Sequence, residues 1–142
     1  MLKQIPKIIT PDLMKIMMEM GHADIMIFAD ANYPAYSNAK KLIRLPGVEI
    51  TELLEAVLPY FPLDCFVANP VRLMRNLDSE PIPEIWDTYK EIIRKYDEEK
   101  AFADFSLIDR LPFYEESQKA SVIVQTTTTE RYANIALQKG VI

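Results

Sequence analysis

Two side chains in the first quarter of this sequence could do chemistry. His22 is the only histidine, and a histidine transfers protons readily near neutral pH. Asp30 directly follows the apolar run of residues 25–29, so it stands at the end of a predicted buried strand, where open α/β sheets place ligand groups. Each also has an ordinary interpretation, which is a helix-dipole contact for His22 and a turn-forming side chain for Asp30.

A second pair of candidates, Arg110 and Tyr114, surrounds the start of a short helix predicted from residue 112 to residue 119. The planar guanidinium of Arg110 could donate to the oxygens of a sugar. The simpler interpretation of Arg110 is a surface ion pair with Glu115 or Glu116.

A third group, Tyr132 and Asn134, follows a run of four threonines at residues 126–129. The tyrosine offers an apolar face with a hydroxyl, and the asparagine offers a donor and an acceptor. The threonine run is either a hydroxyl-rich binding loop or a solvated connection. These residue types suit a sugar but are common elsewhere.

Other kinds of site are disfavoured by what the sequence lacks. One histidine and one cysteine do not make a zinc site of the usual type. Cys65 lies in an apolar context that predicts a buried thiol in a strand. There is no phosphate-binding loop and no G-x-G-x-x-G or G-x-S-x-G motif. We therefore expect neither a metal nor a cofactor.

Composition narrows the class of protein further. The chain has 142 residues, 49% of them hydrophobic, and 16 basic residues against 21 acidic ones, for a formal net charge of −5. Such a balance argues against nucleic acid as a partner. No segment approaches the roughly 18 apolar residues of a membrane span, and the first residues do not form a signal peptide. We expect a cytoplasmic protein.

Apolar patterning predicts one α/β domain over residues 1–142, with three layers in which helices flank a mixed sheet. The first helix should start after the N-cap Thr10 and stop at Gly21. Further helices are expected from Thr51 to about Pro59 and over residues 83–96 and 112–119. Strands are expected over residues 25–29, 65–67, 71–74, 105–108, 121–125 and 134–137.

Three blocks of sequence, in order, resemble the fucose mutarotase / ribose pyranase family. Residues 20–24 and 29–35 are similar to its G-H-G-D-E, strand, D-A-N-F-P-A pattern. Residues 110–120 resemble the R-F-x-F-Y-E-R-A-x-K-A of the fucose branch, and residues 130–141 resemble the terminal E-x-x-Y-[GA]-N-I…K-K-G-V. The resemblance extends along the chain and implies a cofactor-free acid–base mutarotase.

The resemblance also implies roles for individual residues. His22 is similar to the family's proton donor, and Tyr114 to a pocket tyrosine of the fucose branch with a catalytic role. Asp30, Arg110 and the stretch Tyr132, Ala133 and Asn134 correspond to sugar-binding positions. The implied assembly is a homo-oligomer, typically a decamer, with pockets at subunit interfaces.

The chain departs from the family pattern at a few positions. Ala23, Ile25 and Thr129 replace Gly, Glu and Gly, and position 133 carries Ala where much of the fucose branch has Gly. Loss of a glycine at Ala133 is expected to affect a loop that needs positive φ. Alternatives to an L-fucose mutarotase are a ribose pyranase and a non-catalytic sugar-binding protein.

Overall fold

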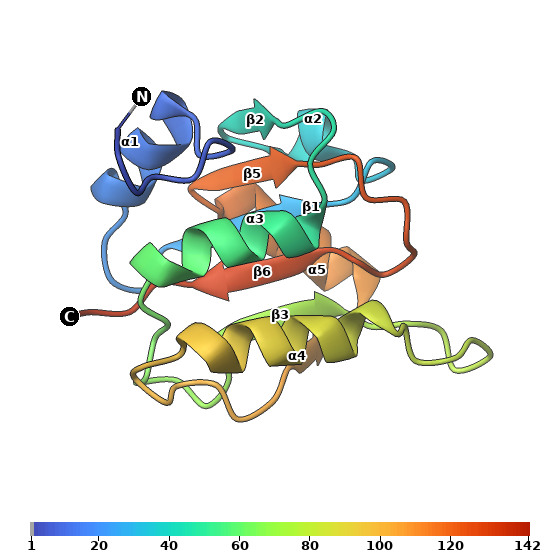
Figure 1. Ribbon diagram of the computed structural model, residues 1–142. Coiled ribbons are helices and arrows are strands. Elements are labelled where there is room, and N and C mark those ends of the chain that lie inside the picture. Colours follow the sequence, from blue (N-terminus) through green and yellow to red (C-terminus); the bar gives the residue numbers. More distant parts are fainter. Residues whose placement is uncertain (1) are drawn as a thin grey trace.

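The structure is a computed structural model and describes residues 2–142. Its centre is a six-stranded mixed sheet with the order β2-β5-β1-β6-β3-β4 (Figure 1). The strands are β1 (Ile25–Ala29), β2 (Leu42–Arg44), β3 (Val71–Met74), β4 (Ser106–Ile108), β5 (Val122–Gln125) and β6 (Ile135–Gln138). The α/β class and the mixed sheet predicted from the sequence are confirmed.

The helices form a layer on each face of this sheet. The larger core is covered by α1 (Pro11–Glu19), α3 (Ile50–Val57) with the short 3-10 helix η1 (Leu58–Tyr60), and α4 (Ile85–Tyr96). The smaller core lies under α2 (Ala35–Asn38) and α5 (Arg110–Lys119), behind the sheet in Figure 1. Among residues 2–142, no helix is long and apolar enough to cross a membrane.

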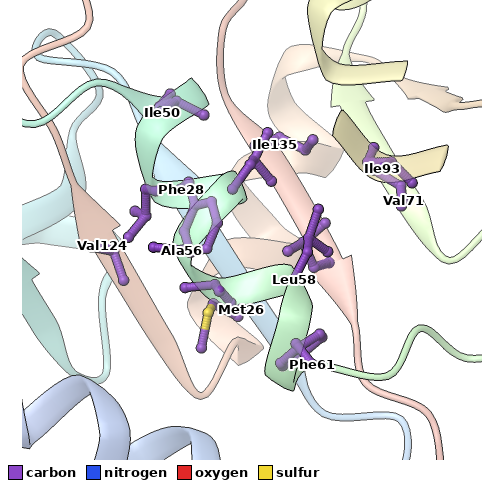
Figure 2. Close-up of a cluster of buried hydrophobic side chains, with 14 of the residues drawn as sticks. Met26, Phe28, Ile50, Ala56, Leu58, Phe61, Val71, Ile93, Val124 and Ile135 are labelled. Carbon is purple, nitrogen blue, oxygen red and sulfur yellow. The ribbon is translucent and has the colours of Figure 1, made fainter. Parts of the chain in front are cut away.

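Strand β1 shows why the sheet needs cover on both faces. Successive side chains of a strand point to opposite faces. Met26 and Phe28 pack in the larger core, where Figure 2 shows them beneath α3, whereas Ile27 and Ala29 pack in the smaller one. All four side chains are fully buried, so the continuous apolar run seen in the sequence is the signature of a strand inside the sheet.

Both ends of α1 follow the prediction in position. Thr10 is the N-cap, and its hydroxyl accepts a hydrogen bond from the Leu13 N–H at 3.2 Å. The helix ends at Glu19 with Met20 as its C-cap, so Gly21 is the first residue past the cap, as expected of a stop, but without the left-handed φ that a glycine often adopts there. The left-handed conformation falls instead on Ala23, with φ of 68°.

Four other segments differ from the expectations. Residues 65–67 form a turn rather than a strand, and Cys65 is exposed, so the prediction of a buried thiol is wrong. The three-residue strand β2 and the single turn of α2 were not predicted. Helix α3 begins one residue before Thr51, because Glu49 and Glu52 form a capping box around its first turn.

The direction of β6 decides which residues meet. Strand β6 is antiparallel to its neighbours β1 and β3, and the other pairings of the sheet are parallel. The C-terminal ends of five strands therefore share one edge with the N-terminal end of β6. We call this the cavity edge, which lies on the right in Figure 1, and we call the opposite one the histidine edge.

Candidate functional site

The cavity edge carries a hollow of about 710 Å³, a size suited to a small ligand. Its walls come from the segments after β1, β3, β4 and β5 and from the segment before β6. Five of the residues predicted from the sequence line it: Asp30, Arg110, Tyr114, Tyr132 and Asn134. Residues separated by about a hundred positions in the chain therefore meet where the topology brings strand ends together.

Asp30 and Asn134 form the buried floor of this cavity. The Asn134 amide donates to Asp30 Oδ2 at 2.8 Å, and the Asp30 N–H donates to Asn134 Oδ1 at 2.8 Å. The Asn32 N–H donates to Asp30 Oδ1, also at 2.8 Å. Burial raises the pKa of Asp30 even though these hydrogen bonds lower it. The result is a fixed carboxylate with lone pairs left to accept further hydrogen bonds from the cavity.

Helix α5 brings Arg110 and Tyr114 to the cavity from one turn of helix. Arg110 is the first residue of α5, is exposed, and forms no ion pair within 4.0 Å in residues 2–142. The expected pair with Glu115 or Glu116 is wrong, because Glu116 Oε1 lies 2.9 Å from Arg72 Nη1. The Arg110 guanidinium thus stays available to a ligand.

Among the cavity residues that the sequence analysis did not single out, Tyr33 and Arg75 bear most on the geometry of the site. Tyr33 is buried, and its ring packs edge-on against Tyr114 with ring centroids 5.5 Å apart. Burial raises the pKa of Tyr33 to about 12. Arg75 follows β3 directly and holds Asp109 Oδ1 at 3.0 Å through Nε. The position of Arg75 after a predicted strand, the same signal that marked Asp30, could have identified it.

The backbone before β6 differs from expectation. Ala133 is fully buried in the larger core and does not line the cavity, and its φ is not positive. The positive φ of this segment, 57°, belongs to Tyr132. The concern about a lost glycine at position 133 is therefore wrong, and the strained residue is the tyrosine beside it.

The threonine run contributes mainly to structure. Thr126 and Thr128 are buried, and Thr128 Oγ1 donates to the Glu49 carboxylate at 2.6 Å and accepts from the Ile50 N–H at 2.8 Å. This run therefore ties the start of α3 to the end of β5. Thr129 alone among the four lines the cavity.

His22 lies at the histidine edge, away from the cavity. Strand β1, which separates His22 from Asp30, has five residues and therefore spans roughly 17 Å. Within one chain, His22 cannot reach a ligand that rests on Asp30. The structure brings the other predicted side chains together but leaves the predicted proton donor outside their cavity.

A buried aspartate holds His22 in place. His22 Nε2 lies 3.2 Å from Asp64 Oδ2, to which the Gln138 amide donates at 2.8 Å. The Phe66 N–H donates to Asp64 Oδ1 at 2.9 Å. Burial raises the pKa of Asp64, but these hydrogen bonds together bring it below its usual value. An ionised carboxylate only accepts, so Nε2 carries the proton and Nδ1 is left for chemistry.

Nothing in the sequence around Asp64 marked it as functional, because its partners are distant in the chain. Its neighbour Phe66 is 72% exposed and packs edge-on against the His22 ring, with centroids 5.6 Å apart. Over residues 2–142, no cluster of three or more His, Cys, Asp or Glu could hold a metal ion. The histidine edge is thus an acid–base pair beside an exposed aromatic ring.

The sequence and fold match known proteins over nearly their whole length. Residues 3–142 match the model of the RbsD / FucU transport protein family. The chain belongs to this family. It is 47% identical to the fucose mutarotase from Streptococcus pneumoniae, solved in complex with L-fucose, over 99% of each chain with a TM-score of 0.92.

Two further solved structures extend the comparison. FucU from Bifidobacterium longum is 40% identical over 99% of each chain, with a TM-score of 0.91. RbsD from Bacillus subtilis, complexed with D-ribose, is 18% identical, with a TM-score of 0.77 over 100% of this chain and 99% of that chain. The likeness to RbsD concerns the fold alone.

Proposed function

We propose that this protein is a sugar mutarotase, an isomerase that interconverts the α and β anomers of a monosaccharide, with L-fucose as its substrate. The observation that carries the proposal is the full-length match, at 47% identity, to a fucose mutarotase in complex with L-fucose. The polar cavity lined by Asp30, Arg110 and Asn134 is consistent with a ligand rich in hydroxyl groups. The proposed location is the cytoplasm.

Ring opening of a cyclic hemiacetal requires two proton movements. A base takes the proton of the anomeric hydroxyl, and an acid protonates the ring oxygen as its bond to the anomeric carbon breaks. The free aldehyde rotates and the steps reverse on its other face. In our proposal His22 is the acid in its doubly protonated form, in which Nε2–H donates to Asp64 and Nδ1–H is given to the ring oxygen. Tyr114 exchanges the anomeric proton. Asp30, Arg110, Tyr132 and Asn134 hold the other hydroxyls.

The separation of His22 from the cavity leads to the proposed assembly. A cavity that needs the histidine edge can be completed by a second copy of the chain, so the pockets would lie between subunits of a closed homo-oligomer, for which we propose a decamer. The exposed Phe66 beside His22 supports this arrangement, because a large exposed aromatic residue is typical of an interface.

The activity is tested by NMR saturation transfer between the α and β anomeric protons of L-fucose. We expect the protein to accelerate exchange and His22→Asn to lose that acceleration. Acceleration with D-ribose but not with L-fucose would make the protein a ribose pyranase. Binding of either sugar without exchange would make it a sugar-binding protein, and both results would contradict the proposal.

The shared pocket is tested by mixing two inactive variants. His22→Asn disables the histidine edge and Arg110→Ala disables the cavity edge, so neither homo-oligomer should be active. After unfolding and refolding together in equal amounts, about a quarter of the interface pockets would contain two intact halves. Recovery of about that share of activity supports pockets between subunits. No recovery, with mixed oligomers shown by mass spectrometry, would contradict them.

A further inference from the structure

The backbone at Tyr132 is in an unfavourable conformation in the cavity wall. Its φ of 57° is in the left-handed region, which costs a non-glycine residue about 1 kcal/mol or more. Tyr132 lines the cavity, and Asn134 follows two positions later. A relaxation of this segment would move both side chains, so something in the fold must keep it in place.

Two aromatic side chains of α4 hold the carbonyl groups of this segment. The Trp86 indole N–H donates to the Tyr132 carbonyl at 2.9 Å, and the Tyr89 hydroxyl donates to the Ala133 carbonyl at 2.8 Å. Trp86 and Tyr89 are three positions apart and therefore lie on the same face of the helix. Both are buried, and neither lines the cavity.

We propose that Trp86 and Tyr89 are positioning residues for the sugar cavity, because their two hydrogen bonds hold Tyr132 and Ala133 in the conformation that presents Tyr132 and Asn134 to the ligand. This proposal rests on the proposed function. The pair acts from the far side of the backbone, without touching the sugar. We call it the aromatic clamp.

The surroundings of the aromatic clamp keep both hydrogen-bond donors protonated. Burial raises the pKa of Tyr89 far above its usual value, and the negative charges of Glu130, Asp30 and Glu49 raise it further. The Tyr89 hydroxyl therefore stays protonated at neutral pH and beyond the pH at which a free tyrosine ionises. The indole N–H of Trp86 is a donor only and does not titrate. The clamp is thus insensitive to pH around neutrality.

The kinetic test removes the donors and keeps an aromatic ring at each of the two positions. We expect Trp86→Phe and Tyr89→Phe each to raise the KM for L-fucose about five- to tenfold, the loss that one buried hydrogen bond brings. Ile93→Val is the matched control, because Ile93 is a fully buried residue of the same helix that makes no contact of this kind. It should lower the thermal midpoint while leaving KM unchanged.

A purely structural role predicts a different result. If both Phe variants lost only thermal stability, with KM like that of Ile93→Val, the aromatic clamp would be disproved. If the unmodified protein accelerated anomer exchange of neither L-fucose nor D-ribose, the proposed function would fail. A crystal structure of the variant that carries both Phe substitutions would then still test the clamp. A negative φ at Tyr132 in that structure supports it, and a retained positive φ overturns it.

Discussion

The two edges of the sheet each contain one buried aspartate, and the pKa values of these two aspartates are shifted in opposite directions. At the cavity edge, burial outweighs hydrogen bonding and raises the pKa of Asp30. At the histidine edge, hydrogen bonds from Phe66, Gln138 and His22 outweigh burial and lower the pKa of Asp64. The same residue type therefore ionises more readily at the histidine edge than at the cavity edge, because the balance between burial and hydrogen bonding differs.

The largest difference between the edges should appear in catalysis. Asp64→Asn removes the negative charge and leaves one acceptor oxygen, which cannot serve both the Phe66 N–H on one side and His22 with Gln138 on the other. We expect anomer exchange of L-fucose to fall by about 10²–10⁴-fold, the value of one positioned acid. Asp30→Asn should chiefly raise KM. NMR saturation transfer at several sugar concentrations measures both quantities.

The pair of variants His22→Asn and Asp64→Asn provides the control. If the two residues act as one unit, the double variant should be no slower than the slower single variant. Losses that multiply, or an Asp64→Asn variant within about tenfold of the unmodified rate, would show that Asp64 does not serve His22.

A second difference should appear in stability, because the histidine edge leaves no space at Gly140. A Cβ atom there would overlap the Leu63 carbonyl oxygen and lie 2.9 Å from Asp64 Cα. We expect Gly140→Ala to destabilise the fold by about 1–3 kcal/mol. The thermal midpoint should fall by several degrees, at about 2–4 °C per kcal/mol.

Gly21→Ala is the matched control at the same edge. Its Cβ would meet only the Asp24 carboxylate, at 3.8 Å, and its φ is not in the left-handed region. We expect almost no change in its thermal midpoint. Equal midpoints for the two variants would contradict the close approach of Gly140 to the segment that holds Asp64.

The smallest effect lies in the titration of the two aspartates. Asp64 should titrate below the usual aspartate pKa and Asp30 above it. As pH falls, Asp64 therefore contributes stability that is lost between its usual and its lowered pKa. Protonation of Asp30 removes the cost of a buried charge, so stability is gained as pH falls from its raised pKa to the usual value.

Carbon-13 NMR of the side-chain carboxyl groups would follow both titrations directly. Asp64→Asn and Asp30→Asn would assign the two signals. Chemical denaturation of the same variants should show that Asp64→Asn weakens the acid-induced loss of stability. Two aspartates that titrate on the same side of the usual value would remove the contrast between the edges.

The sequence predicted those parts of the fold whose signals are local. Strand β1 was predicted with its observed bounds, because a continuous apolar run is followed by an aspartate. Asp30 was identified as a candidate for the same reason. By contrast, β2 has only three residues, too few for periodicity, and residues 65–67 are apolar enough to suggest a strand although they form a turn.

The parts that were missed depend on distant pairings. Asp64 meets His22 and Gln138, which are 42 and 74 positions away along the chain, so no window of sequence around it shows that it is buried. The resemblance to the family named His22 and Asp30 together. It implied pockets at subunit interfaces, but not that these two residues lie at opposite edges of one subunit, because this depends on the order and direction of the strands.

The place of β6 in the sheet also affects how the chain comes to be folded. Residues 135–138 lie between β1 and β3, so the β2-β5-β1 half and the β3-β4 half are not joined until this segment is inserted. Strands β1 and β2 also lack a common neighbour until β5 has emerged, so during synthesis on the ribosome only β3 and β4 can pair early, and the rest of the sheet waits for nearly the entire chain. The unpaired strands are exposed to non-native pairing throughout that interval.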